Sequence, residues 1–373
     1  MRALFLTADL GGNVPPFLAV AKELANRGIE IEMAGLQSGR VPYAQPHFLA
    51  AIAAGPEGGK GLAKSGAMMR LMAGRSTATQ VSTLIAERRP DVIVVDCMFA
   101  AALRGTLGAD IPVAVLFHSI GRFWFSSFDR QAGLGLGIIG LRPRKLWAAA
   151  DLRLILTAPE LDPASSDPKF QDYVWTGTTE KGVEAAQRET ASHPRVLVAL
   201  SSTDWPGMLP VYRRIVAALS ELPVDALVTT GGVDLGGRLE GTPNVKVLNW
   251  ADHAEILPTV DLVIGHGGHS TTLKTLAHGI PLLILPINPI SDQRIIGRTV
   301  QAAGLGRTLP KSTHEPRLAE TVAGMLADGN LRERASANGR KLRAADPGEK
   351  VAADHILGLL EGKGRETSGG DRA

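Results

Sequence analysis

Cysteine is nearly absent from the sequence, and long hydrophobic runs are missing. The single cysteine, Cys97, excludes a disulfide within the chain and favours a reducing, cytoplasmic location. Because Cys97 lies in the apolar run "VIVVDCMF", we interpret it as a small buried residue in preference to a nucleophile. The apolar start "MRALFLTADL" is too short to cross a membrane and is interrupted by Asp9. It therefore predicts a first strand, and neither a signal peptide nor an integral membrane anchor.

The chain also has little excess charge of either sign, and it lacks several motifs that bind nucleotides or metals. The formal net charge of +3 is small for 373 residues, so nothing in it requires a nucleic-acid partner. The chain has no G-x-x-x-x-G-K-[ST], which argues against a P-loop nucleotidase. No acidic residue stands at useful spacing from His266 and His269, so we disfavour a metal there. We expect no metal and no bound cofactor.

Short β-branched runs alternate with longer amphipathic segments along most of the chain. This alternation predicts parallel α/β layers, and 373 residues are too many for one compact core. We therefore expect an α/β protein with two facing Rossmann-like domains and a cleft between them. The predicted strands are 3–8, 29–34, 91–96, 112–117 and 152–157 in the first half, and 195–200, 225–230, 244–249, 261–266 and 281–286 in the second.

The polar stretch 176–193 carries no strand signal and marks the predicted join between the domains. We assign residues 1–180 to the first domain and residues 181–345 to the second. A helix over 346–362 is expected to follow. The charged, glycine-rich residues 363–373 are predicted to be disordered.

The most informative stretch is "DLVIGHGGHSTTLKTLAHG", in which a buried strand leads directly into a helix. The start of that helix offers unpaired backbone N–H groups and a positive dipole end. Gly267 and Gly268 let the main chain approach an anion closely. The side chains of His266, Ser270 and Thr271 add hydrogen-bond donors. Together these residues predict a cradle for phosphate oxygens.

A longer stretch around this turn carries a family resemblance. "PNVKVLNWADHAEILPTVDLVIGHGGHSTTLKTLAHGIPLLILPINPISDQ" has a Trp near its start, a His-x-Gly phosphate turn and an Asp-Gln pair. It resembles the donor-site signature of nucleotide-sugar-dependent glycosyltransferases of the GT-B fold, above all the bacterial natural-product glycosyltransferases. A weaker likeness covers residues 90–117. The matching residues are Trp250, His266 with Gly268, and Asp292 with Gln293.

The resemblance implies an inverting transfer of a sugar from a UDP- or dTDP-sugar to a small apolar or aromatic natural-product acceptor. It implies that Trp250 or its neighbours meet the nucleobase, with a plain core Trp as the alternative. His266 and the helix start would hold the diphosphate leaving group, whose growing charge such donors stabilise. Lys274 and Ser201 depart from the family, which often has a ribose-binding Glu and a Gly there. The implied donor-binding residues are Ser202, Trp250, His266, Gly268, His269, Ser270, Thr271, Asp292 and Gln293.

The first loop lacks the residue that the family uses as a base. The family pattern is roughly Gly-His-x-x-Pro, and "LGGNVPPF" places Asn13 at the position of the His. An amide has no useful basicity. Asp96 matches the family's Asp that orients the His, so Asp96, or Asp9 at another strand end, is our first candidate for the base. His118 ranks below Asp96.

Three other interpretations stay open. An acidic or already ionised acceptor would need little base catalysis. A non-catalytic, auxiliary relative would bind the donor or a partner enzyme. A sugar-nucleotide epimerase, the least favoured, would need acid and base groups beside the donor sugar.

Aromatic residues are few, yet four of the seventeen fall between Phe123 and Phe128, just before a glycine-rich stretch. Such a segment lines an apolar ligand pocket or packs as a helix on the sheet, and we keep both interpretations. The methionines within 55–75 likewise serve variable ligands or fill core space. The predicted acceptor-binding residues are Met68, Met72, Phe99, His118, Phe123, Trp124 and Phe128. We expect a nucleotide-sugar and a small acceptor as partners, with a homodimer left open.

Overall fold

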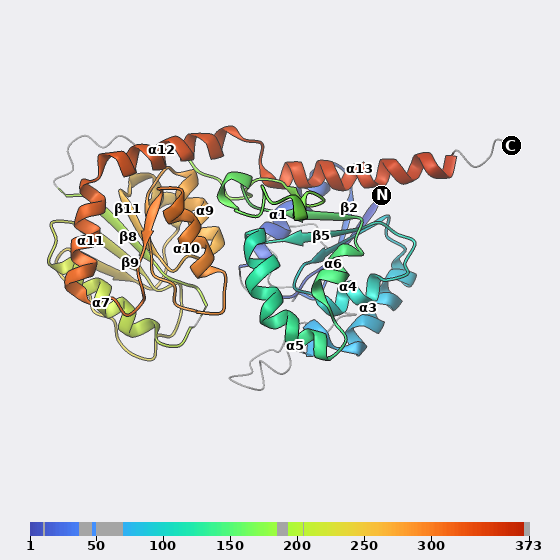
Figure 1. Cartoon of the computed structure of the whole chain (residues 1–373), viewed down its shortest axis with the longest axis horizontal. Helices are drawn as coiled ribbons and strands as arrows, with labels where there is room; N and C mark the ends of the chain where they lie inside the picture. The colour runs from blue at the N-terminus through green and yellow to red at the C-terminus, as the bar shows by residue number, and fades with distance from the viewer. Residues whose placement is uncertain (10–11, 37–46, 50–69, 185–192, 204, 369–373) are drawn as a thin grey trace. The chain divides into compact units, whose positions relative to one another are not determined.

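A computed structural model describes residues 1–9, 12–36, 47–49, 70–184, 193–203 and 205–368. The chain divides into two compact units, Glu180–Ala345 and a unit formed by Met1–Thr179 together with Asp346–Ala373. Each unit contains one parallel sheet with helices packed on it (Figure 1). The α/β architecture is the predicted one, and all ten predicted strands are present.

The sheet of the first unit has the strand order β3-β2-β1-β4-β5-β6-β7. Its central strands are buried apolar runs, as expected for a parallel sheet with both faces covered. The chain order reverses between β1 and β4, and α/β sheets bind ligands beyond the carboxyl ends of the strands at such a switch point. The strands are β1 (Arg2–Leu6), β2 (Glu30–Ala34), β3 (His47–Leu49), β4 (Val92–Asp96), β5 (Val113–Phe117), β6 (Leu152–Ile155) and β7 (Val174–Trp175).

The helices of the first unit include the last helix of the chain, α13. It packs on α1 and on β6 (Figure 1), and Ala352, Ala353 and Ile356 are fully buried in the core of this unit. The helices are α1 (Val14–Asn26), α3 (Arg75–Arg88), α4 (Ala100–Thr106), the π-helix η2 (Phe123–Phe128), α5 (Ala132–Ile138), α6 (Pro143–Ala148), the 3₁₀ helices η3 (Pro159–Leu161) and η4 (Pro168–Phe170), and α13 (Gly348–Ser368).

Helix α13 ends at Ser368, beyond residue 362, where the last helix was predicted to end. Residues 369–373 lie outside the described residues.

The sheet of the second unit has the order β10-β9-β8-β11-β12-β13, again parallel throughout. Its strands are β8 (Arg195–Ala199), β9 (Asp225–Thr229), β10 (Val245–Leu248), β11 (Leu262–Gly265), β12 (Leu282–Ile284) and β13 (Gly306–Thr308). Its helices are α7 (Met208–Ser220), α8 (His253–Ile256), the 3₁₀ helix η5 (Leu257–Thr259), α9 (His269–Ala277), α10 (Gln293–Ala302), α11 (Glu315–Ala327) and α12 (Gly329–Ala344).

Close helix packing supports the second unit. Helix α11 packs on α7, and α12 packs on α9. A Cβ atom at Gly339 of α12 would lie 2.6 Å from the Cα atom of Gly279, just after α9, so only glycine permits this approach. The end of α9 is thereby held close to α12.

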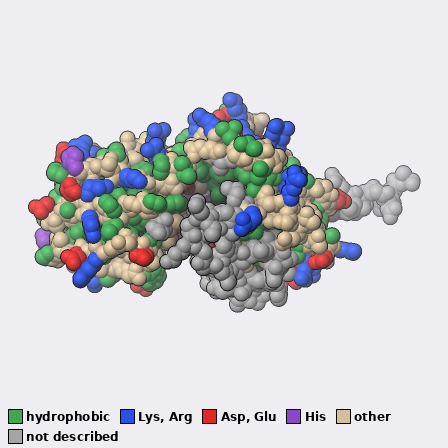
Figure 2. All heavy atoms as spheres, turned by 90° about the horizontal axis from the view of Figure 1, so that it is seen from below, with side chains coloured by type: hydrophobic (Ala, Val, Ile, Leu, Met, Phe, Trp, Pro, Cys, Tyr) green, Lys and Arg blue, Asp and Glu red, His purple; other side chains and the backbone are tan. Residues whose placement is uncertain are grey.

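Two surface properties bear on partners. Within the described residues, no helix combines the length and the apolar character needed to cross a bilayer. On the face shown in Figure 2, basic and acidic side chains are interspersed with apolar ones.

Candidate functional site

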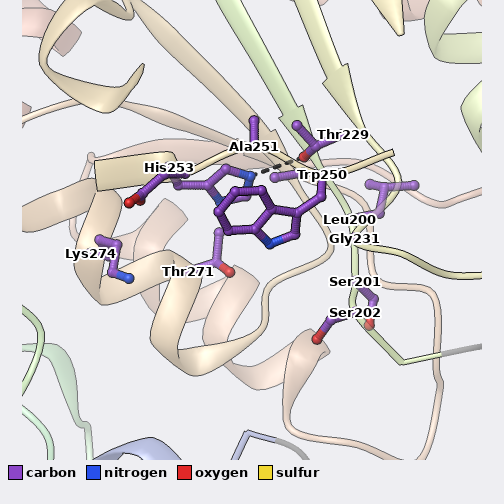
Figure 3. A pocket seen from close by; sticks show the side chains of 12 residues that line it. Leu200, Ser201, Ser202, Thr229, Gly231, Trp250, Ala251, His253, Thr271 and Lys274 are labelled. Atoms are coloured by element: carbon purple, nitrogen blue, oxygen red, sulfur yellow. Dashed lines mark hydrogen bonds between the residues drawn. The ribbon is translucent and has the colours of Figure 1, made fainter. Parts of the chain in front are cut away.

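A pocket of about 310 Å³ opens at the carboxyl edge of the second sheet, beside the start of α9 (Figure 3). The side chain of Trp250 stands in this pocket, and the residue is 70% exposed, which rules out the core interpretation. An exposed indole is available to stack on a planar base. The lining residues are Ala199, Leu200, Ser201, Ser202, Thr229, Gly231, Trp250, Ala251, Asp252, His253, Thr271 and Lys274.

The phosphate turn joins β11 to α9 through Gly267 and Gly268, and at both positions a larger residue would clash with its neighbours. Gly267 has φ +86°, and a Cβ atom there would lie 2.9 Å from the carbonyl oxygen of Gln293. A Cβ atom at Gly268 would lie 2.6 Å from the imidazole of His266. The His266 ring therefore lies directly over Gly268, beside the first residue of α9, the partly exposed His269.

The side chain of His266 has a hydrogen-bonding atom and a protonation state that suit an anionic ligand. Its Nδ1 atom is buried and has no hydrogen-bond partner among the described residues. Burial lowers the pKa of His266 to about 4, so the ring is neutral near pH 7. A neutral imidazole carries one N–H donor, which a phosphate oxygen can accept without any proton transfer. The Nδ1 atom of His266, beside the start of α9, is therefore available to a ligand.

The side chains of the first turns of α9 are partly engaged with each other. The Ser270 hydroxyl donates to Oε1 of Glu180, and Oε2 of Glu180 lies 3.5 Å from Nζ of Lys274. In this arrangement the hydroxyl proton of Ser270 is used by the carboxylate, and the donor-binding role of Ser270 stays a prediction. Thr271 lines the pocket as predicted. No pattern in the sequence indicates Glu180, which stands 90 residues from Ser270 along the chain.

The Asp292-Gln293 pair begins α10. Gln293 is buried, and its Oε1 accepts from the backbone N–H groups of Ile287 and Asn288 at 2.7 and 2.9 Å. Both acceptor sites of that oxygen are filled, so it cannot also accept from a sugar hydroxyl. Gln293 shapes the loop after β12, while Asp292 is only partly buried at the helix start.

In the first unit, the residues at the predicted base position form one buried cluster. Asn13 Nδ2 donates to Asp96 Oδ2 and to the carbonyl oxygen of Ala8, each at 2.7 Å. The Thr7 hydroxyl also donates to Asp96 Oδ2, and the backbone N–H of Met98 donates to Asp96 Oδ1. Asp96 and Asn13 are each 1% exposed. The structure brings these two predicted residues together, but it buries both.

Two further predicted residues flank this cluster. His118 directly follows β5, and its Nδ1 lies 3.7 Å from Asp96 Oδ1. Asp9 follows β1 and is partly exposed. Of the four candidate catalytic positions, Asp9 and His118 are thus the ones with side chains open to solvent.

The aromatic segment packs as a helix, which was the second of the two interpretations, and the burial of its rings disfavours the predicted acceptor-binding role. Phe123, Trp124 and Phe128 are at most 9% exposed. The rings of Phe123 and Phe128 lie 4.9 and 5.1 Å from that of Trp124, which also packs on Trp147 of α6. Edge-to-face packing of this kind buries large apolar rings well.

Other predicted acceptor residues are buried as well. Phe99 is fully buried and Met72 is 9% exposed, so both fill core space. Met68 lies outside the described residues. Among the predicted acceptor-binding residues in the described part of the chain, His118 is the one that is not buried, and its side chain is 15% exposed.

Known proteins share the fold of this chain, and some match part of its sequence. Residues 214–357 match the family model described as Erythromycin biosynthesis protein CIII-like, C-terminal domain. Demethyllactenocin mycarosyltransferase of Streptomyces fradiae is 33% identical over 178 residues, which are 47% of this chain and 37% of that protein. The glycosyltransferase of kitacinnamycin superposes with a TM-score of 0.75 at 21% identity, covering 96% of this chain and 99% of that one. The chain therefore has the fold of these glycosyltransferases, the GT-B fold.

A second solved structure concerns the donor. The glycosyltransferase VinC in complex with dTDP superposes on this GT-B chain with a TM-score of 0.69 at 16% identity, covering 97% of this chain and 100% of that one. The matches to the first curated relatives are shorter, and span only 37% and 47% of those relatives' own length.

One group of side chains in this GT-B chain has the composition of a metal site. The side-chain atoms of Asp96, Cys97 and His118 that could bind a metal ion lie within 4.8 Å of one another. Among the described residues, this is the group with such a composition and spacing. Burial, and then the charge of Asp96, raise the pKa of the Cys97 thiol well above its usual value. The thiol therefore stays protonated, and Asp96 already accepts three hydrogen bonds. The donor set fits a hydrogen-bonded cluster better than a cation.

Sequence reasoning missed several residues that line the pocket, among them Thr229, Gly231 and His253. The Thr229 hydroxyl lies 3.0 Å from His253 Nε2 (dashed line in Figure 3), and burial, followed by Lys274, lowers the pKa of His253. A Cβ atom at Gly231 would lie 2.9 Å from the carbonyl oxygen of Ser201. The signal was present in "TTGG", hydroxyls and glycines directly after a parallel strand.

Proposed function

We propose that this chain transfers a sugar from a UDP- or dTDP-sugar to a small apolar or aromatic natural-product acceptor, with inversion at the anomeric carbon. One observation carries the proposal: the phosphate turn, with the unpartnered Nδ1 of His266, stands beside a pocket that holds the exposed Trp250. A flat apolar ring next to an anion cradle suits a nucleoside diphosphate. The dTDP in the VinC complex supports a deoxythymidine or uridine donor.

The donor side would act by electrostatics. Breaking the bond from the anomeric carbon to the diphosphate places negative charge on the leaving oxygen. The backbone N–H groups at the start of α9, with the N–H of neutral His266, stabilise that charge as it develops. Because donors of this kind are fixed before the reaction, they need no reorganisation during it. Attack from the face opposite the diphosphate gives inversion in a single displacement.

The first test is nucleotide binding. Thermal shifts of the wild type should appear with dTDP or UDP and be smaller with ADP and GDP, because binding to the native state alone raises the melting temperature. His266→Ala should lose most of the shift. His314→Ala, an exposed histidine of the same unit, is the matched control and should keep it. Equal shifts for wild type and His266→Ala would contradict the assignment of the phosphate turn.

The second test is transfer. With the nucleotide that binds, a panel of sugar donors and phenolic or apolar alcohol acceptors is screened for product, and the anomeric configuration of the product is read by NMR. A β-glycoside from an α-donor establishes inversion, and an α-glycoside refutes it.

A second function is favoured by one observation. Asn13 occupies the family's base position and holds Asp96 in a buried network, which is the arrangement expected of a non-catalytic, donor-binding auxiliary protein. Nucleotide binding without transfer to any acceptor, together with stimulation of an active glycosyltransferase, would select this function.

A further inference from the structure

The buried cluster at the carboxyl edge of the first sheet shows why Asp96 is a poor base. An ionised carboxylate offers about four acceptor positions. Thr7 and Asn13 fill those of Oδ2, and the backbone N–H of Met98 takes one of Oδ1. With 1% of Asp96 exposed, an acceptor hydroxyl reaches this carboxylate only if hydrogen bonds break. Nδ1 of His118 lies 3.7 Å from Oδ1, and the thiol of Cys97 belongs to the same cluster.

His118 has the geometry that Asp96 lacks. Strands β4 and β5 are neighbours, with Asp96 paired to Leu116, so the residue after β5 lies beside the end of β4. The Nδ1 atom of His118 lies 3.7 Å from Asp96 Oδ1 and 4.0 Å from Cys97 Sγ. The ring packs edge-on against Trp124, with centroids 5.1 Å apart. Since Nδ1 faces the buried carboxylate, Nε2 lies on the side of the ring away from it.

The surroundings fix the ring without burying it. Trp124 is 1% exposed and part of the aromatic core, so it forms a rigid wall for the imidazole. The His118 side chain keeps 15% exposure, against 2% for the side chain of Asp96. Catalytic hydrogen bonds are often long in unliganded enzymes and shorten when the substrate binds, and 3.7 Å is within that range of adjustment.

We propose that His118 is the general base for the acceptor and that Asp96 is its positioning residue. This inference rests on the proposed glycosyl transfer. Nε2 of His118 takes the proton of the acceptor hydroxyl, and the electron pair of that O–H bond forms the new bond to the anomeric carbon. The bond from that carbon to the diphosphate breaks, and its electron pair leaves with the diphosphate. The Asp96 carboxylate stabilises the imidazolium and keeps the neutral ring in the tautomer with its proton on Nδ1.

This arrangement also gives Asn13 a role. Its amide donates to Asp96 Oδ2 from the position where the family has its histidine. The carboxylate is thereby anchored on one side and directs its other oxygen to the strand that carries His118. The base has moved from the loop after β1 to the end of β5, around the same carboxylate.

The first experiment compares His118→Gln with the wild type in the transfer assay. Removing a general base should lower kcat about 10²–10⁴-fold. The KM for the donor and the thermal shift with dTDP should stay unchanged. His355→Gln, an exposed histidine of α13 in the same unit, is the matched control and should keep the wild-type rate. A wild-type kcat for His118→Gln overturns the inference alone, whereas a wild type that transfers nothing to any acceptor removes the proposed function and the inference with it.

Two further readouts separate chemistry from structure. Added imidazole should restore part of the rate of His118→Gly, and the loss caused by His118→Gln should shrink as the acceptor phenol becomes more acidic. A merely structural role would give no rescue and an equal loss for every phenol, and that result overturns the proposal.

The positioning role of Asp96 is tested by a double variant. If Asp96 acts through His118, Asp96→Asn should lower kcat, and the double variant should be no slower than His118→Gln alone. Losses that multiply would show that Asp96 acts independently, and they would overturn this part of the inference.

Discussion

At the scale of the residue, the position of the His266 ring in the phosphate turn requires that residue 268 has no Cβ atom. Its backbone has φ −66° and ψ 137°, which any residue can adopt, so the need for glycine is steric and not conformational. In Gly268→Ala the new Cβ atom would stand 2.6 Å from the His266 ring and displace it. We expect nucleotide affinity to fall about tenfold or more, which is about 1.4 kcal/mol. Calorimetric titration with dTDP measures this, and an unchanged Kd would contradict it.

Substitution of Trp250 should change the affinity for nucleotide strongly and the stability of the fold only weakly. Stacking of one base on an aromatic ring contributes about 1–3 kcal/mol, so Trp250→Ala should weaken nucleotide binding by roughly 5- to 150-fold. The melting temperature of the Trp250→Ala variant should differ little from that of the wild type, because Trp250 is 70% exposed. Ile290→Ala, 66% exposed and outside the pocket, is the control. Equal affinities for the two variants would remove the stacking role.

Protonation of His266 makes the free energy of unfolding depend on pH. Its pKa is lowered to about 4, against about 6.5 in an unfolded chain. Between these values the unfolded state binds more protons, so the free energy of unfolding falls as the pH drops from about 6.5 to about 4. His266→Gln should lack this part of the fall. Denaturant titrations at several pH values compare the two proteins.

The comparison isolates His266 because the other titrating histidines are present in both proteins. His253 and His278, whose pKa values burial also lowers, contribute equally to each curve. Parallel stability curves for wild type and His266→Gln would contradict the lowered pKa.

Which residues could be predicted follows from how far their partners lie along the chain. The roles of His266 and Gly268 are local, because one strand-to-helix turn sets them. The pairing of Ser270 and Lys274 with Glu180 is not local, and neither is the approach of His118 to Asp96. No spacing in the sequence encodes such contacts, and only the order of the strands creates them.

At the scale of the element, two glycines in neighbouring helices of the second unit have opposite roles. A Cβ atom at Gly339 would press α12 away from Gly279, so Gly339→Ala should destabilise the unit by about 1–3 kcal/mol. Gly324 of α11 has nothing within 4 Å of its Cβ position, so Gly324→Ala should stabilise by about 0.5–1 kcal/mol. Unfolding midpoints of the two variants should move in opposite directions, and a common direction would contradict the packing.

Elements were predictable where a single periodicity dominates. The buried strands are short apolar runs, and all the predicted ones exist. The segment 123–128 was ambiguous because its aromatic residues suit a pocket wall and a core equally. The structure resolves it as a π-helix whose rings pack on Phe117 and Trp147. That choice depends on space beside β5, which is a tertiary property.

At the scale of the whole molecule, the last helix stabilises the first unit. Ile356 is fully buried against α1 and the first sheet, so Ile356→Ala should cost about 2–5 kcal/mol. Hydrogen exchange should show lost protection in β1 and β6 and not in β8 and β11. Leu331→Ala, in the core of the second unit, is the matched control and should give the reverse pattern. Identical exchange maps for both variants would contradict the division into units.

The return of α13 also governs how such a chain can be recombined. The second unit is one uninterrupted segment, Glu180–Ala345, inserted into a unit that both begins and ends the sequence. A single crossover near residue 180 would exchange α13 together with the second unit and set a foreign helix against α1 and β6. A chimera with crossovers at both 179/180 and 345/346 would instead carry Trp250, the phosphate turn and the Glu180–Lys274 ion pair together, and would leave the first unit whole.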